Sequence, residues 1–169
     1  VYKKYLKKGE RILEAACGPG YTAIPLSHFF KVTAFDREPR ILEAARANAE
    51  RFGDEINVVE ADFFNIADEF GSNSFKAVSS GGVLEHFPKE QVRRLVDLQL
   101  EVAPLVFAQM PLFTAEEAGK INEYGIETYH YTRKMWLKEL LEGFNILEYR
   151  QIPRPETARF REFMVVVGR

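Results

Sequence analysis

Residues 11–22 read RILEAACGPGYT, a short apolar run that gives way to a turn containing two glycines. Ile12 and Leu13 favour a strand, and helix-forming residues begin after Gly20. Because glycine has no Cβ, Gly18 and Gly20 can adopt positive φ and let a ligand lie against the main chain. The turn also presents the free N–H groups of a helix N-terminus. The pattern therefore predicts a strand, a tight turn and a helix that bind a nucleotide-like cofactor; alone, it also fits a turn that only reverses the chain.

Segments typical of strands and helices alternate through the rest of the chain. Strands are expected at 31–36, 56–60, 75–80 and 105–110, and helices at 21–30, 39–52, 89–102 and 133–141. Such alternation predicts a parallel sheet with helices on both faces. The last two strands, 145–152 and 159–167, are joined by a connection too short for a crossover helix, so they must be antiparallel to each other.

The 169 residues contain no internal repeat or break in composition, which predicts a single α/β domain over residues 1–169. Within it, residues 1–10 form a short lead-in. Residues 112–131 are expected to be an irregular segment on the substrate side.

The composition narrows the classes of partner. Lys and Arg number 23 and Asp and Glu 25, a net charge of −2 without long blocks of like charge, so no nucleic-acid partner is expected. One cysteine excludes an intrachain disulfide and fits a reducing compartment. No apolar run reaches the ~18 residues of a membrane span, and no signal-peptide pattern opens the chain. We therefore expect a cytoplasmic protein without membrane association. No metal site is expected either, because no cluster of residues has the spacing of metal ligands.

The residues suited to ligand binding all fall where a strand ends. They are Gly18 and Gly20 after the first strand, Asp36 after the second, Asp62 and Phe63 after the third, and residues 80–86 after the fourth. In an open α/β sheet, ligands bind at the carboxyl ends of the strands, near the point where strand order reverses. Asp36 is placed to accept hydrogen bonds from both hydroxyls of a ribose, and Asp62 beside Phe63 suits an adenine.

Four segments carry a family resemblance: ILEAACGPG (12–20), VTAFD (32–36), VVEADFF (58–64) and FKAVSSGGVLEHF (75–87). In this order and spacing they resemble the cofactor motifs of the class I S-adenosylmethionine-dependent methyltransferases, and most narrowly the small-molecule, methyltransferase type 11-like branch. Residues 130–148 are also similar to that branch. The resemblance implies a Rossmann-like, three-layer αβα fold whose seven-stranded sheet has the order 3-2-1-4-5-7-6, with strand 7 antiparallel.

The resemblance also assigns roles to individual residues. It implies that Glu14, Ala16, Cys17, Gly18 and Gly20 hold the methionine part of S-adenosylmethionine, that Asp36 with Arg37 binds the ribose, that Asp62 with Phe63 binds the adenine, and that Ser80 and Gly81 line the sulfonium end. Ala16 departs from the family pattern, which often has glycine there, and its methyl group narrows the approach of the ligand slightly.

Methyl transfer from a sulfonium is a direct displacement, so the protein mainly aligns donor and acceptor in a dry cleft. A base helps where the acceptor must lose a proton, and His86 is the best-placed candidate; a structural hydrogen bond is the alternative for this histidine. Cys17 is interpreted as a small packed residue rather than a nucleophile.

The acceptor is expected to be a small molecule, apolar or aromatic. The fourth strand lacks the Asn/Asp-Pro-Pro-aromatic and Pro-Cys motifs of nucleic-acid methyltransferases. Aromatic residues of the 112–131 segment, namely Phe113, Tyr124, Tyr129 and Tyr131, with His130 among them, either cover the acceptor pocket or are ordinary core and surface residues.

Two alternatives remain open at this point. Gly18, Gly20 and Ala23 followed by Asp36 also satisfy the dinucleotide fingerprint of an NAD-dependent oxidoreductase. The chain could also be a non-catalytic subunit with a methyltransferase fold. The sequence leaves the acceptor atom and the oligomeric state undetermined.

Overall fold

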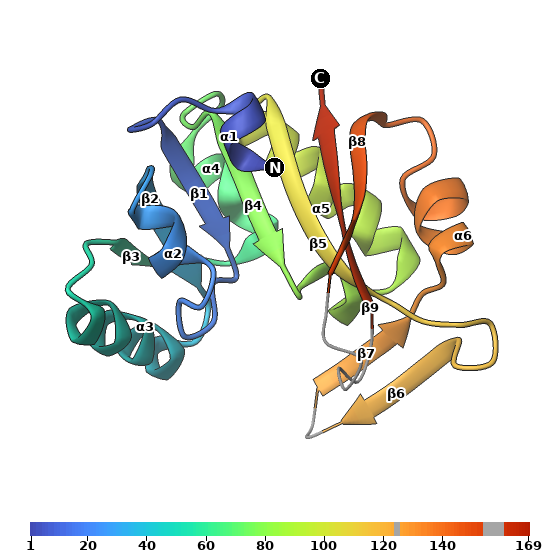
Figure 1. The fold of residues 1–169 in the computed structure, drawn as a ribbon. Helices are drawn as coiled ribbons and strands as arrows, with labels where there is room; N and C mark the ends of the chain where they lie inside the picture. Colours follow the sequence, from blue (N-terminus) through green and yellow to red (C-terminus); the bar gives the residue numbers. More distant parts are fainter. Residues whose placement is uncertain (124–125, 154–160) are drawn as a thin grey trace.

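A seven-stranded sheet forms the centre of the computed structural model, which describes residues 1–123, 126–153 and 161–169. Its strands are β1 (Arg11–Ala15), β2 (Lys31–Asp36), β3 (Asn57–Glu60), β4 (Ala77–Gly81), β5 (Leu105–Leu112), β8 (Asn145–Ile152) and β9 (Arg161–Gly168). They lie in the order β3-β2-β1-β4-β5-β9-β8 (Figure 1). The first five are parallel, and β9 is antiparallel to both β5 and β8. The expected order 3-2-1-4-5-7-6, with an antiparallel seventh strand, is confirmed.

Helices cover both faces of this sheet, which gives the three-layer αβα arrangement (Figure 1). One face carries α1 (Tyr2–Tyr5), α2 (Ala23–Ser27) and α3 (Pro39–Phe52), and the other carries α4 (Ile66–Phe70), α5 (Lys89–Val102) and α6 (Arg133–Met135). The two long helices follow their sequence signals. Pro39 occupies the first turn of α3, and Gly53, at φ 71°, ends it in the left-handed conformation.

The central strands β1, β4, β5 and β9 are buried on both faces, as the almost continuous apolar sequence of β5 predicts, whereas β3 and β8 at the two edges of the sheet contain no buried residue. Leu13, Val78 and Val106 contact the α4–α5 side, while the alternate residues Ile12, Ala77 and Phe107 contact the α1–α3 side. The core holds the strands in register, so their carboxyl ends meet at one edge of the sheet.

The expectation of an irregular segment over 112–131 is wrong for much of its length. β6 (Gly119–Glu123) and β7 (Ile126–His130) form a separate antiparallel two-stranded sheet that projects past the carboxyl ends of the central strands (Figure 1). Among the side chains described in these two strands, none is buried. In β7, Ile126 and Glu127 are exposed and the next three residues are half-buried, so this strand has no buried face of the kind that alternating apolar residues predict.

The helix expected at 133–141 is also modified. Thr132 caps it, since its Oγ1 accepts a hydrogen bond from Met135 N at 3.3 Å. After α6 the chain widens into a π-helical turn, Trp136–Leu140, in which Leu141 N donates to Trp136 O at 2.9 Å. This turn buries both Trp136 and Leu140 in the core.

Candidate functional site

The carboxyl ends of β1, β2, β3 and β4 surround a cavity of about 370 Å³. Its lining includes residues expected from the sequence: Ala16, Gly18, Asp36, Arg37, Asp62, Phe63 and His86. Phe35, Ala61, Phe64, Gly82, Val83, Phe87 and Ile126 complete the described wall. The volume falls within the range of ~300–1,000 Å³ that is usual for small-molecule sites.

The glycine turn after β1 has the conformation that its sequence predicts. Gly18 has φ 52° and Gly20 φ 86°, and Ala16 also has a positive φ of 47°. A Cβ added at Gly18 would meet no atom within 4 Å, so the main chain there borders open space. A Cβ added at Gly20 would lie 3.2 Å from Ile24 Cδ1, so Gly20 is needed instead for close packing of α2.

Asp36 links this turn to the end of β2. Its Oδ2 accepts a hydrogen bond from Gly18 N at 3.1 Å, and its Oδ1 accepts one from Glu38 N at 3.2 Å. A carboxylate offers about four lone-pair directions, so further acceptor capacity remains toward the cavity. Asp36 therefore fixes the turn and can also bind hydroxyl groups.

Asp62 and Phe63 take different positions at the end of β3. Asp62 is exposed and caps a 3-10 turn, Phe63–Asn65, with its Oδ1 accepting from Phe64 N at 2.7 Å. Phe63 is buried, and its ring lies edge-on to Phe35 and Phe87, at centroid distances of 5.7 and 6.2 Å. Phe63 thus builds the apolar wall of the cavity, and Asp62 lies at its polar side.

Glu14 lies apart from this cavity in a buried polar group on the α1–α3 face. Its side chain is 2% exposed, and burial raises its pKa to about 8 despite an opposing hydrogen bond with Ser79. Ser79 Oγ lies 2.7 Å from the hydroxyl of Tyr2, whose ring stacks on Phe107 at 4.3 Å. Tyr2 and Ser79 were not predicted from the sequence; the aromatic lead-in was the available signal for Tyr2.

Four other expected cofactor residues also lie outside the cavity lining: Gly20, described above, and Cys17, Ser80 and Gly81. Ser80 is 1% exposed, and its Oγ has no hydrogen-bond partner. At Gly81, an added Cβ would lie 3.5 Å from Thr22 Oγ1, so α2 passes close over the end of β4. Burial raises the pKa of the Cys17 thiol to about 12, and its Sγ donates to Gly18 O at 3.3 Å. A thiol with this pKa stays protonated, which fits a packed residue rather than a nucleophile.

His86 joins the cavity to the β6–β7 hairpin. Its Nδ1 lies 3.0 Å from Glu127 O and 3.2 Å from Thr128 Oγ1. Because a carbonyl oxygen can only accept, Nδ1 carries the proton that is donated to Glu127. In the neutral ring, Nε2 is then the acceptor. The same hairpin places Ile126 in the cavity wall.

The aromatic residues expected near the acceptor mostly contact one another. Phe113 stacks on His130 at 3.7 Å, and Tyr129 stacks on Tyr131 at 5.8 Å. Tyr131 is buried and donates a hydrogen bond from its hydroxyl to Phe87 O at 2.9 Å. Neither Phe113, Tyr129 nor Tyr131 lines the 370 Å³ cavity. Tyr124 lies outside the described residues.

In residues 1–123, 126–153 and 161–169, no group of three or more His, Cys, Asp or Glu side chains is arranged to hold a metal ion. Over the same ranges, no helix has the length and apolar character required to cross a bilayer.

Comparison with known proteins identifies the family. The profile of a family described as methyltransferase domain matches residues 12–102, more than half of the chain. A ubiquinone biosynthesis O-methyltransferase from Methylocella silvestris is 40% identical over 80 residues, which cover 47% of this chain and 30% of that protein. An uncharacterized methyltransferase, YodH from Bacillus subtilis, is 28% identical over 125 residues, which cover 70% of this chain and 53% of YodH. The matched regions thus span less than two thirds of either relative.

Solved structures share the fold at low sequence identity. A methyltransferase from Methanosarcina mazei superposes with a TM-score of 0.79 at 17% identity. The superposition covers 99% of this chain and 95% of the Methanosarcina chain. A 1,6-didemethyltoxoflavin-N1-methyltransferase from Burkholderia thailandensis superposes with a TM-score of 0.72 at 21% identity. The superposition covers 96% of this chain and 72% of the Burkholderia chain. With the motif-bearing strand ends and the matching family profile, these similarities show that the chain belongs to the class I methyltransferase family, whose cofactor is S-adenosylmethionine.

Proposed function

We propose that this protein binds S-adenosylmethionine in the 370 Å³ cavity and transfers its methyl group to a small-molecule acceptor. The observation that carries the proposal is the meeting of three strand ends at one cavity: the open main chain at Gly18, the carboxylate of Asp36, and Asp62 with Phe63. The family profile covers the same elements.

The residues fit the parts of this cofactor in turn. Asp36, with Arg37 beside it, suits the ribose hydroxyls, because its carboxylate retains acceptor capacity. Asp62 and the apolar wall at Phe63 suit the amine and the ring of adenine. The methionine part would lie along residues 16–18 toward the buried carboxyl of Glu14, whose Oε2 has no partner.

When bound, S-adenosylmethionine would supply a methyl group on a sulfonium centre: the acceptor atom would take this methyl group by direct displacement, and S-adenosylhomocysteine would leave. The protein contributes alignment and the exclusion of water. Phe87 and Ile126 provide apolar surface around the cavity, and His86 holds the hairpin that carries Ile126. The Nε2 of His86 is also the ring nitrogen that can take a proton from an acceptor hydroxyl.

Two relatives support a small-molecule acceptor. One is a ubiquinone biosynthesis O-methyltransferase, and the other is a 1,6-didemethyltoxoflavin-N1-methyltransferase. Their names give different methylated atoms, oxygen in one and nitrogen in the other, so they favour the class of acceptor and not its identity.

Binding of S-adenosylhomocysteine, measured by titration calorimetry, tests the cofactor site. We expect Asp36→Ala to weaken binding at least tenfold, because both ribose hydroxyls lose their acceptor. Asp36→Asn, which keeps one acceptor oxygen, should bind with intermediate affinity. The control is Asp97→Ala, which changes an exposed carboxylate on α5. Binding of NAD instead of S-adenosylhomocysteine, or unchanged affinity in Asp36→Ala, would refute the proposed site.

A further inference from the structure

Glu85 is a buried carboxyl group that the proposed cofactor site does not use. It lies in the 3-10 turn Leu84–His86, a few residues beyond Ser80 and Gly81 at the end of β4. Its side chain is 5% exposed, and its Oε2 has no hydrogen-bond partner. Burying a carboxyl without a partner destabilises a protein, so a group kept in this state is a candidate for binding a ligand.

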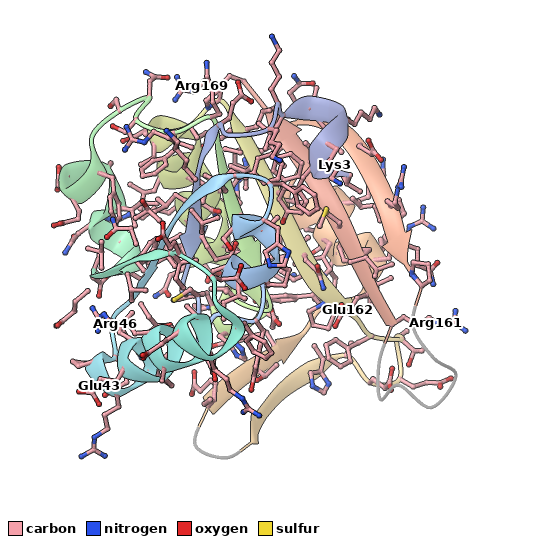
Figure 2. The ribbon with its side chains drawn as sticks, turned by 60° about the vertical axis from the view of Figure 1, so that its left-hand side comes forward. Lys3, Glu43, Arg46, Arg161, Glu162 and Arg169 are labelled. Atoms are coloured by element: carbon pink, nitrogen blue, oxygen red, sulfur yellow. The ribbon has the colours of Figure 1, made fainter. Side chains whose placement is uncertain are left out.

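Polar side chains from two other strands lie near Glu85. Glu162 on β9 is 8% exposed, and its Oε2 accepts a hydrogen bond from Gln109 Nε2 at 2.6 Å. Gln109 is next to the same turn, because its carbonyl accepts from Gly82 N at 3.0 Å. Figure 2 shows Glu162 within the body of the protein, whereas the adjacent Arg161 points outward at its edge. We call Glu85, Gln109 and Glu162 the acidic cluster.

Both acids make the acidic cluster favourable for positive charge. Burial is the main cause that raises the pKa of Glu85 to about 8, and the negative charge of Glu162 adds to it. Below pH 8 the raised pKa keeps Glu85 protonated, so a ligand with a cationic nitrogen would favour release of this proton, compensate the charge of the ionised carboxylate and donate to Glu85 Oε2. A carboxylate ligand would increase the repulsion.

The acidic cluster borders the cofactor cavity on the side away from Asp36. Gly82 lines the cavity, and a Cβ added at Gly82 would lie 3.7 Å from Glu85 Oε1. The cluster extends from there across β5 to β9. It therefore lies beyond the end of β4, on the other side of β1 from Asp36 and Asp62, which are proposed to bind the adenosine.

We propose that the acidic cluster of Glu85, Gln109 and Glu162 binds a cationic amine of the methyl acceptor. This inference rests on the proposed methyltransferase function, and it narrows the acceptor from any small molecule to one that carries an amine near the reacting atom. Glu85 provides the direct contact, while Gln109 fixes the orientation of Glu162 through their hydrogen bond.

Three probes of similar shape test this preference: benzylamine, benzyl alcohol and benzoate. Each is titrated by ligand-observed NMR into the protein saturated with S-adenosylhomocysteine. We expect benzylamine to bind about tenfold more tightly than benzyl alcohol, and benzoate more weakly than either, since a charge-assisted hydrogen bond contributes more than a neutral one.

Variants distinguish amine binding at the acidic cluster from non-specific attraction to acidic residues on the surface. Glu85→Gln should weaken benzylamine about tenfold and leave benzyl alcohol unchanged, and Glu162→Gln should weaken benzylamine by a smaller factor. The matched control, Glu90→Gln, changes an exposed glutamate five positions away and should have no effect. Melting temperatures of all variants confirm that they are folded.

Several results would overturn the inference: no binding of benzylamine, equal binding of benzyl alcohol or benzoate, or equal benzylamine affinity in Glu85→Gln. The affinity for S-adenosylhomocysteine is measured on the same samples. If the protein without substitutions does not bind S-adenosylhomocysteine, the proposed function is rejected. If it binds S-adenosylhomocysteine but shows no preference for benzylamine, only the role of the acidic cluster is rejected.

Discussion

Ala16 has a φ of 47°, in the left-handed region that favours glycine. The Cβ of an L-residue in this conformation costs about 1–2 kcal/mol, while glycine loses more entropy on folding, so the two effects partly cancel. We predict that Ala16→Gly raises the free energy of unfolding by about 0.5–1 kcal/mol, which corresponds to a melting temperature about 1–4 °C higher.

A second alanine-to-glycine substitution provides the control for this prediction. Ala49 is buried in the interior of α3, where its backbone is helical. Ala49→Gly should lower the free energy of unfolding by about 1 kcal/mol. If thermal unfolding shows both variants to be destabilised alike, strain at Ala16 is not significant.

The buried acids Glu14 and Glu85 make stability depend on pH. Burial raises the pKa of each to about 8, above the ordinary value of 4.5. Between these values the folded protein holds protons that the unfolded chain has released. The stabilisation is therefore complete below pH 4.5 and is lost as the pH rises toward 8.

We predict that the free energy of unfolding falls between pH 5 and pH 8, by about 1.4 kcal/mol per pH unit for each acid. Urea titrations across this range measure the slope. Glu85→Gln removes one of the two titrating groups and should reduce the slope by about half. A slope that is unchanged in this variant would contradict the assignment of the proton to Glu85.

At the level of elements, His86 is one of the residues that connect the β6–β7 hairpin to the cavity. The hydrogen bonds from His86 to Glu127 and Thr128 join residues more than 40 positions apart, and Ile126 reaches the cavity through the same hairpin. His86 can therefore affect cofactor binding without taking part in proton transfer.

We predict that His86→Ala increases amide hydrogen exchange in β7 several-fold, because the strand loses the hydrogen bonds of its Glu127 carbonyl and Thr128 hydroxyl with the imidazole. Exchange in β4 should not change. Thr128→Val is the matched variant, since it removes one contact to the ring and retains the imidazole; its effect should be smaller. Unchanged exchange in His86→Ala would leave proton transfer as the remaining role for this histidine.

At the level of the whole molecule, the parts predicted from the sequence are those that local patterns determine. β5 was identified because buried parallel strands have almost continuous apolar sequences, and β2 because its residues are β-branched and aromatic. Asp36 and Asp62 were assigned because strand ends meet at one edge of the sheet. The positions of these strands and residues can be predicted without knowing which side chains from distant parts of the sequence contact them.

The parts that were missed depend on contacts between residues far apart in the chain. Tyr2 reaches Ser79 across 77 positions, and the acidic cluster brings together residues from three different elements. The roles suggested for Phe113 and Tyr129 also depended on unknown partners, which are His130 and Tyr131. Composition and periodicity do not encode such pairings.

The topology predicts how one ligand should affect the whole chain. Because β1, β2, β3 and β4 are adjacent and parallel, S-adenosylhomocysteine in the cavity should contact all four following loops at once. We predict slower amide exchange at residues 16–20, 36–38, 61–65 and 82–87 when the ligand is added. Exchange in β8, which lies at the opposite edge of the sheet, should be unaffected.

NAD at the same concentration is the control and should protect none of these loops. Exchange measured by mass spectrometry distinguishes this pattern from general stabilisation, in which β8 would also be protected because ligand binding raises the free energy of global unfolding. Peptides that exchange through local opening therefore provide the decisive comparison. Protection confined to the loop after β1 would mean that the cavity does not hold the ribose and adenine, since Asp36 and Asp62 lie in other loops.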